Sequence, residues 1–217
     1  MSTRALALSI FSLLSCALAP AGALAQTPPT GGTAYPPPAP VPAPVPTPVP
    51  AAPVPLPLST LPRVTVPGTA AQLMPTGLAA APAEAPPAVQ NAVWAANELQ
   101  RLPYRYGGGH NPRFSDRGYD CSGTVSYALH AAGLLTRPLD SSSFMRWGMN
   151  GPGLWFTVYT NPGHAFVIIA GLRLDTSAGG VTAAAAKQLP TAGQSGPRWR
   201  PILRSTRGYQ VRHLVGW

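Results

Sequence analysis

The sequence predicts an α+β fold, in which N-terminal helices pack on an antiparallel β-sheet. Two observations predict this class. Apolar residues at helical spacing occur twice between residues 88 and 133, and strand-like segments then follow as far as residue 212. Helices grouped before a run of strands are typical of α+β domains with an antiparallel sheet. A third observation, the crowding of proline into one region, leaves room for a single folded domain in the 217 residues.

Proline is concentrated between Pro28 and Pro87, a stretch with 20 of the chain's 29 prolines and only two charged side chains. Proline lacks the backbone N–H that helices and central strands need, and few large apolar side chains lie here to offset the entropy lost on ordering. From residue 27 to about 57, proline alternates with alanine and valine, as in a polyproline II spacer. We therefore expect a disordered linker over residues 26–87 and one folded domain over residues 88–217.

The first 25 residues predict a secretory signal peptide. Arg4 provides a short positive segment, residues 5–18 form an apolar run, and Ala23-Leu24-Ala25 has the small-x-small form of a signal peptidase site. The apolar run is shorter than the roughly 20 residues that span a bilayer, so we expect no transmembrane helix. The alternative is a lipoprotein acylated at Cys16. Both routes predict export to the periplasm, the cell wall or the extracellular space.

The first helix is expected over residues 89–99. Its apolar face comprises Val89, Val93, Ala96 and Leu99. Pro103 ends the helical segment. Residues 104–109 then form a glycine-rich loop, which lacks the lysine and hydroxyl residue of a phosphate-binding P-loop.

The second helix is expected to begin at Cys121. Asp120 is a good N-cap residue, Gly133 suits the C-terminal end, and an apolar stripe comprises Val125, Leu129 and Ala132. After a loop rich in Pro, Gly and Ser, the apolar period changes to that of strands. The expected strands are residues 155–159, 164–169, 172–175 and 209–212.

Cys121 is the sharpest candidate for a catalytic group. Removal of the signal peptide, or acylation of Cys16, leaves it as the only free thiol, so no disulfide framework is expected. The backbone N–H groups at a helix N-terminus favour a thiolate and lower the pKa of a thiol placed there. We therefore favour a reactive nucleophile over a buried core cysteine.

Such a nucleophile needs a base, and the candidates are His110, His130, His164 and His213. His164 is favoured because it lies at the start of a strongly apolar strand, where a rigid scaffold can hold an imidazole against the helix end. A base is in turn oriented by a third polar group. If residues 165–170 and 172–175 pair as a hairpin about Gly171, Asp175 returns to the neighbourhood of His164 and can be that group.

Four motifs together resemble the NlpC-type cysteine peptidases, which remodel bacterial cell walls. The motifs are Pro103-Tyr104-Arg105-Tyr106-Gly107-Gly108, Tyr119-Asp120-Cys121-Ser122-Gly123, Ala132-Gly133-Leu134 after the second helix, and Gly163-His164-Ala165. The resemblance spans the whole folded part. It implies a papain-like core and cleavage of peptidoglycan stem peptides between D-γ-glutamate and the following diamino acid.

The resemblance also implies roles for individual residues. Cys121 would be the nucleophile and His164 the base, while the Tyr104 hydroxyl would face the oxyanion. Asp120 and Ser122 match positions that line the substrate pocket. Two departures from the family pattern bear on the site: the third catalytic position, commonly histidine, falls on Asp175, and Gly151-Pro152-Gly153-Leu154-Trp155 replaces the usual Pro-Gly-Asp-Leu segment.

Charge and composition limit the partners. Residues 98–217 contain 13 Lys and Arg against 5 Asp and Glu, which in an exported protein indicates weak adhesion to anionic envelope polymers rather than nucleic-acid binding. A solvated basic face without a partner is the alternative. No His/Cys/Asp cluster has metal-ligand spacing, so we expect neither a metal nor another cofactor. The expected partner is the peptidoglycan stem peptide, bound by a monomer.

Two other functions remain open from the sequence. The first is a peptidoglycan-binding module that keeps the fold and hydrolyses nothing. The second is an amidase or acyltransferase of the same structural clan, acting on another wall or lipid substrate. The presence of both Cys121 and His164 favours an enzyme over a binding module.

Overall fold

The computed structural model describes residues 61–201 and 204–217. The predicted signal peptide, Cys16 and the first part of the predicted linker, residues 26–60, lie outside the described residues. No helix in the described part of the chain is both long and apolar enough to cross a membrane.

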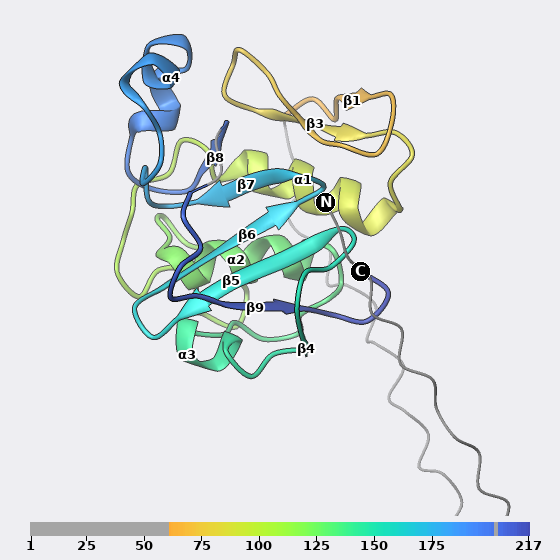
Figure 1. The fold of residues 1–217 in the computed structure, drawn as a ribbon, viewed down its shortest axis with the longest axis vertical. Helices are drawn as coiled ribbons and strands as arrows, with labels where there is room; N and C mark the ends of the chain where they lie inside the picture. The colour runs from red at the N-terminus through yellow and green to blue at the C-terminus, as the bar shows by residue number, and fades with distance from the viewer. Residues whose placement is uncertain (1–60, 202–203) are drawn as a thin grey trace, which may run out of the picture. The chain divides into compact units, whose positions relative to one another are not determined.

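A six-stranded antiparallel sheet forms the centre of the domain, with strand order β4-β9-β5-β6-β7-β8 (Figure 1). Its strands are β4 (Met149–Asn150), β5 (Phe156–Asn161), β6 (His164–Ile169), β7 (Leu172–Asp175), β8 (Arg198–Arg200) and β9 (Gln210–His213). All five pairings are antiparallel. The α+β class and the antiparallel sheet are confirmed, and the four strands expected from the sequence are present within two residues of their predicted bounds.

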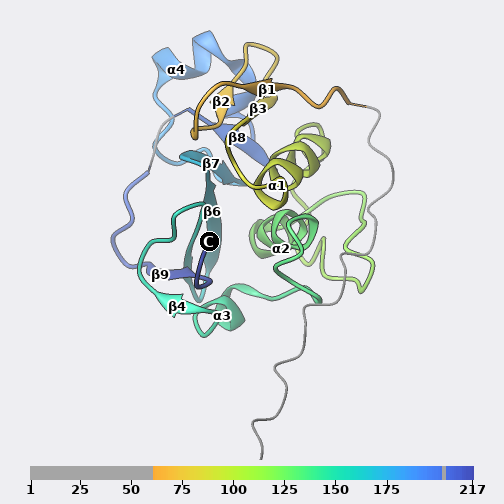
Figure 2. The same cartoon turned by 90° about the vertical axis from the view of Figure 1, so that its right-hand side faces the viewer.

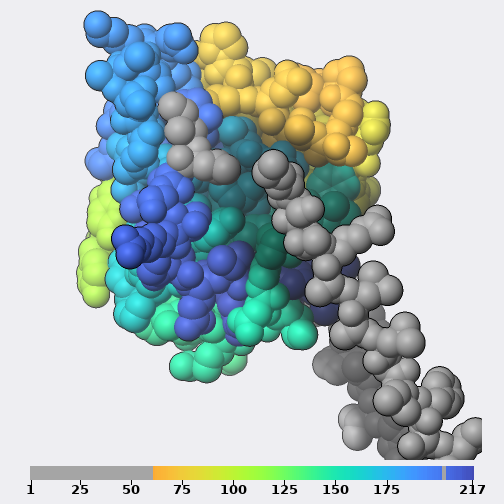
Figure 3. All heavy atoms as spheres, in the orientation of Figure 1, coloured from red at the N-terminus to blue at the C-terminus, as the bar shows by residue number. Residues whose placement is uncertain are grey.

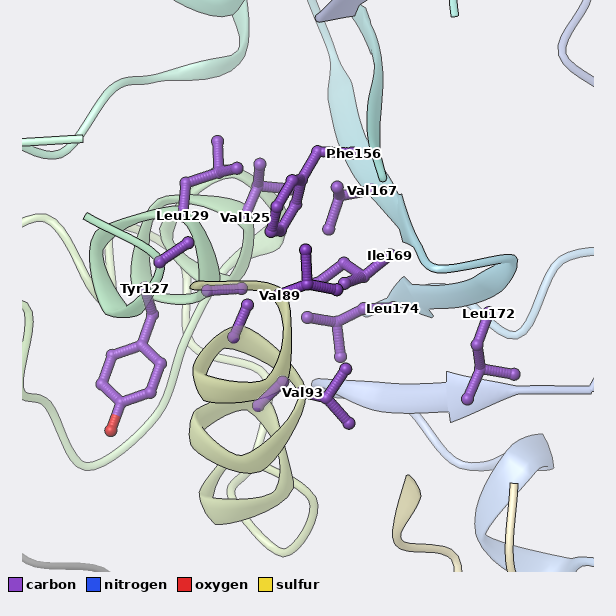
Figure 4. Packing of buried hydrophobic residues seen from close by; sticks show 14 of the residues in the cluster. Val89, Val93, Val125, Tyr127, Leu129, Phe156, Val167, Ile169, Leu172 and Leu174 are labelled. Atoms are coloured by element: carbon purple, nitrogen blue, oxygen red, sulfur yellow. The ribbon is translucent and has the colours of Figure 1, made fainter. Parts of the chain in front are cut away.

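Helices α1 (Pro87–Glu98) and α2 (Cys121–Ala131) lie on the same side of this sheet (Figure 2). Val89 and Val93 of α1 point into the core that the strands share with α2 (Figure 4). The strands contribute apolar side chains to the same core, among them Phe156, Val167, Ile169 and Leu174. This core fixes the N-terminus of α2 relative to β6.

The packed domain begins before residue 88, contrary to the predicted linker over residues 26–87. A small sheet of order β1-β3-β2 precedes α1. Its strands are β1 (Thr65–Val66), β2 (Gln72–Leu73) and β3 (Ala79–Pro82). Figure 3 shows these residues, in orange and yellow, at the upper edge of the domain.

The buried alanines of β3 explain why the proline count was misleading here. Ala79, Ala80 and Ala81 are fully buried, because small side chains let the strand approach α1 closely. The amide side chain of Asn97 bonds both the N–H and the C=O of Ala79, at 2.8 and 2.9 Å. Pro82 is the last residue of β3 and Pro87 the first of α1, where a missing N–H costs least.

Three short helical segments complete the described chain. They are α3 (Ser141–Phe144), α4 (Ala183–Gln188) and the 3₁₀ turn η1 (Pro190–Gly193). The side chain of Asp140 caps α3 by accepting from the Ser143 N–H at 2.7 Å. The Thr160 hydroxyl of β5 donates to the Ser141 carbonyl at 2.6 Å, which fixes the start of α3 against the sheet.

Candidate active site

Cys121 is the first residue of α2, as predicted. The carboxylate of Asp120 caps the helix by accepting from the Gly123 N–H at 2.7 Å. The Cys121 side chain is 8% exposed, and its Sγ lies 3.6 Å from Oγ of Ser141 at the start of α3. The thiol therefore lies at the positive end of a helix and beside a hydroxyl group.

His164 and Asp175 meet across the β6–β7 hairpin. Ala170 and Gly171 form the two-residue connection with φ of 46° and 84°, the positive values that a type I′ turn requires. The hairpin brings Asp175 back toward the start of β6, where His164 Nε2 donates to Asp175 Oδ1 at 2.9 Å. The structure thus contains the geometry that the hairpin hypothesis predicted, although the catalytic roles of the two residues stay a prediction.

The thiol of Cys121 and the imidazole of His164 are close enough to shift each other's pKa. Nε2 of His164 is bonded to Asp175, which leaves Nδ1 as the ring nitrogen available to another partner. Burial opposes a thiolate, but His164, the Ser141 hydroxyl and the Ala165 N–H together outweigh it and lower the pKa of Cys121. Burial likewise opposes an imidazolium, yet the bond to Asp175 and the nearby thiol of Cys121 raise the pKa of His164 to about 9.

Asp175 is a fully buried carboxylate on β7. Its Oδ1 accepts from His164 and also from the Ser177 N–H at 2.8 Å. Its Oδ2 lies 3.4 Å from Nη1 of Arg204 and 3.8 Å from Nε of Arg173. Burial alone would raise the pKa of Asp175, but the His164 hydrogen bond, followed by the other partners, lowers it. The carboxylate is therefore ionised and can orient the imidazole.

A cavity of about 420 Å³ opens beside the thiol, and its lining includes Cys121, Tyr104, Asp120 and Ser122. The structure thus brings these predicted residues to one hollow. Tyr104 is 45% exposed, and burial and the nearby thiol raise the pKa of its hydroxyl. The phenol therefore stays protonated and able to donate a hydrogen bond. A larger cavity of about 690 Å³, lined by Leu134, Trp147 and Trp217 among others, contains none of the predicted site residues.

Asp120 and Ser122 both contact His110, which the sequence offered only as one of four candidate bases. His110 Nε2 lies 3.0 Å from Asp120 Oδ1 and 3.2 Å from Ser122 Oγ. The Asp120 carboxylate also accepts from the Gly107 N–H at 3.1 Å. The hydrogen bond to Asp120 raises the pKa of His110. Burial of Asp120 acts to raise the pKa of its carboxyl group, but the bond to His110 and the other partners lower that pKa. At pH values below its own raised pKa, His110 is thus a cationic group in the wall of the cavity.

Sequence reasoning missed His110, Ser141 and Arg204 as neighbours of the site. His110 was named only as a candidate base, and its link to Asp120 depends on the path of the glycine-rich loop. Ser141 follows Asp140 in a pattern that signals a helix start, and that pattern was the available clue. Arg204 follows β8 by four residues, and no sequence signal places it beside Asp175.

The remaining two histidines each contact a loop carbonyl. Nδ1 of His130 lies 2.8 Å from the Leu135 carbonyl, and Nδ1 of His213 lies 3.0 Å from the Gly151 carbonyl. Among residues 61–201 and 204–217, no group of three or more His, Cys, Asp or Glu side chains is arranged to hold a metal ion.

No protein-family model matches the sequence, and no curated protein matches it. Among solved structures, the chain is similar to the peptidoglycan hydrolase RipB from Mycobacterium tuberculosis, with 20% sequence identity and a TM-score of 0.41. The match covers 60% of this chain and 66% of the RipB chain, slightly less than two thirds. The function of this protein is therefore inferred from the geometry of its site.

Proposed function

We propose that this protein is an exported cysteine endopeptidase that hydrolyses peptidoglycan stem peptides. One observation carries the proposal: a thiol at a helix N-terminus has its pKa lowered by an imidazole whose Nε2 bonds a buried carboxylate. Nucleophile, base and orienting group in this order are the parts of a thiol hydrolase. The motif resemblance supports peptidoglycan as the substrate, a papain-like core, and the bond between D-γ-glutamate and the diamino acid as the one cleaved.

The chemistry begins with the thiolate of Cys121 attacking the carbonyl carbon of the scissile amide. The negative charge moves to the carbonyl oxygen, where the Tyr104 hydroxyl can donate a hydrogen bond. A donor in this position is worth about 3 kcal/mol to an acyl-transfer transition state. The His164 imidazolium then gives its proton to the leaving amine as the C–N bond breaks, which leaves an acyl-enzyme on Cys121 and a neutral imidazole.

The second half of the reaction uses the same histidine as a base. Neutral His164 takes a proton from water while the hydroxyl oxygen attacks the thioester carbonyl. The C–S bond breaks, the peptide acid leaves, and the thiolate–imidazolium pair is restored. Asp175 keeps the ring oriented in both steps through its 2.9 Å bond to Nε2.

Polar side chains in the cavity wall favour a charged, peptide-like ligand over an apolar one. Four polar residues that line the cavity are His110, Asp120, Asp140 and Ser142. Export by the predicted signal peptide, with acylation at Cys16 as the alternative, would place this site next to the wall. The excess of basic residues supports weak adhesion to anionic envelope polymers.

Mass spectrometry of muropeptides incubated with the purified protein under reducing conditions tests the proposal. We expect wild-type protein to release fragments cut at the D-γ-glutamyl bond, and Cys121→Ala to release none. His213→Gln serves as a matched control, because His213 contacts a loop carbonyl and lines no part of the Cys121 cavity. Intact peptides with wild-type protein would exclude the hydrolase and favour the binding module. Cleavage between the sugar and the first alanine would favour the amidase.

A further inference from the structure

We propose that Arg204 is a positioning residue, which holds the carboxylate of Asp175 by its second oxygen and so tunes the charge of His164. The inference rests on the proposed function, because it takes Cys121 as the nucleophile and His164 as the base. Arg204 lies in the connection between β8 and β9, well separated in sequence from all three residues.

The two oxygens of Asp175 have different partners. Oδ1 accepts from His164 and from the Ser177 backbone. Oδ2 accepts from Arg204 Nη1 at 3.4 Å, whereas Nε of Arg173, at 3.8 Å, makes no hydrogen bond. In the described part of the chain, Arg204 is therefore the side chain that hydrogen-bonds the carboxylate from the Oδ2 side. Oδ1 is held separately by the Ser177 N–H at 2.8 Å, so loss of Arg204 should leave the bond to Nε2 of His164 in place and change mainly the charge beside the carboxylate.

Arg204 itself lies over two aromatic rings, which pack edge to face on each other. Its guanidinium carbon lies 5.7 Å from the ring centre of Phe166 and 5.6 Å from that of Tyr209, within the range of cation–π attraction. Both rings also flank His164, each at a centroid distance of 6.4 Å. The same aromatic pair thus locates the arginine and the imidazole, with Asp175 between them.

Charged and titratable groups face this cluster from several elements. They are Cys121 from α2, Arg173 beside Asp175 on β7, Arg200 from β8, Arg204 and, just before β9, Tyr209. Arg200 Nε bonds the Asp175 backbone carbonyl at 3.2 Å and leaves the carboxylate to the other partners. Arg204 is the one of the three arginines that is partly exposed, with 22% of its side chain accessible, so it can be changed without opening the core.

The sign of the effect follows from the charges. Arg204 partly neutralises Asp175 and repels an imidazolium, and both actions favour neutral His164. Loss of its charge should therefore raise the pKa of His164 above its value in the wild-type protein. Since neutral His164 is the base that activates water, a pKa increase of half a unit leaves about threefold less base near neutral pH.

Nuclear magnetic resonance titration of His164 in the full protein tests the inference in Arg204→Gln, Arg204→Lys and Arg207→Gln. We expect Arg204→Gln to raise the His164 pKa by about half a unit or more. Arg204→Lys, which keeps the charge, should restore most of the wild-type value. Arg207→Gln is the matched control, because it removes the same charge from the same connection at an exposed residue with no ion pair to Asp175.

An unchanged His164 pKa in Arg204→Gln, or an equal change in Arg207→Gln, would overturn the inference. If Arg204→Gln does not fold, Arg204→Met keeps an aliphatic side chain over the two rings, and the same upward shift is expected. With muropeptides, Arg204→Gln should lower kcat about threefold or more and change KM little. The titration needs no substrate, so it decides the inference even if the protein proves to cleave nothing.

Discussion

At the scale of single residues, Cys121 and His164 depend on each other for their charges. Burial opposes both charged forms, and the attraction between the two groups is one of the effects that outweigh it. The pair can therefore exist as thiolate and imidazolium over a window that ends near the pKa of His164, about 9. Asp175 extends this window upward because it supplies a buried negative charge to the imidazole.

Replacement of Asp175 by asparagine should shorten that window. An amide keeps the shape but not the charge, so the pKa of His164 should fall from about 9 toward its ordinary value of 6.5. The rate of iodoacetamide alkylation of Cys121, measured against pH, should change where His164 loses its proton. We expect this step to move down by about one pH unit or more in the variant. Turnover of muropeptides near pH 7 should drop by about 10²-fold or more, because the imidazole loses both orientation and charge.

The same change predicts a difference in stability. In the wild-type protein the pKa of His164 is raised above its unfolded value, so the stabilisation is complete below about pH 6.5 and is lost as pH rises through about 9. Urea unfolding should show a decline on the order of 2–3 kcal/mol over this range. Asp175→Asn should flatten the decline, whereas Asp116→Asn, a loop carboxylate without a histidine partner in the described structure, should not. A wild-type decline that persists in Asp175→Asn would refute this account.

Sequence reasoning located site residues that follow local rules. Cys121 was found because a helix cap precedes it, and Asp175 because a tight hairpin about Gly171 fixes the distance to His164. His110 and Arg204 could not be found in this way. Their partners are set by the course of irregular loops, which no periodic pattern describes.

At the scale of elements, the glycine-rich loop and helix α2 are in direct backbone contact. A Cβ atom on Gly123 would lie 2.1 Å from the Gly108 carbonyl oxygen and 3.1 Å from Cα of Gly109. The sequence identified this segment as a glycine-rich loop, and in the structure its glycines permit close packing. This contact holds the loop, and with it Tyr104 and His110, beside the N-terminus of α2.

The substitution Gly123→Ala separates two opposing effects. Alanine is favoured over glycine in a helix interior by about 1 kcal/mol. Overpacking against a rigid backbone costs roughly 1–3 kcal/mol. Because the obstacle is a carbonyl group and not a flexible side chain, we expect the overpacking cost to exceed the gain in helix propensity, with net destabilisation of up to about 2 kcal/mol in urea unfolding.

Gly163→Ala provides the comparison for this test. Its added Cβ would have 3.8 Å to the nearest atom, Asn161 Oδ1, and should change stability little. Equal or greater stability of Gly123→Ala relative to wild type would show that the loop moves aside easily.

Strand β8 shows why some elements could not be predicted. Arg198 and Arg200 flank Trp199 and are almost fully buried, which contradicts the rule that charged side chains avoid the core. The structure resolves the conflict through backbone acceptors, since the Arg200 guanidinium donates to the carbonyls of Ala192, Gln194 and Gly196. These carbonyls belong to a turn and a loop and not to a paired strand, so the sequence has no periodic pattern that would reveal the hydrogen bonds.

At the scale of the whole molecule, the segment before α1 belongs to the domain and not to the linker. Asn97 joins three parts of the chain, because it bonds Ala79 of β3 and accepts from Trp199 Nε1 of β8 at 2.8 Å. The Ala71 N–H also donates to the Ala170 carbonyl at the β6–β7 turn. The small sheet thus supports the hairpin that carries His164 and Asp175.

Truncation should distinguish the two parts of the predicted linker. A chain that begins at residue 61 retains every described contact and should keep wild-type activity on soluble muropeptides. A chain that begins at residue 88 loses β1–β3 and two buried hydrogen bonds of Asn97, at about 1 kcal/mol each or more, together with the packing of β3 on α1. We expect it to be less stable by roughly 2–4 kcal/mol in urea unfolding.

Two results of this truncation experiment would contradict these expectations. Equal stability of the two truncated chains would restore the boundary at residue 88. A loss of soluble activity in the chain that begins at residue 61 would show that the proline-rich segment acts in catalysis.

Cys121 is the free cysteine of the described chain, and Cys16 is the other one in the sequence. Among the described residues, Cys121 therefore has no second cysteine with which to close a disulfide. Under oxidation its thiolate would pass to sulfenic acid or to a mixed disulfide with a small thiol, and both forms are restored by an external reductant. Under the proposed function, the redox state of this one sulfur atom would then govern how much of the protein is active.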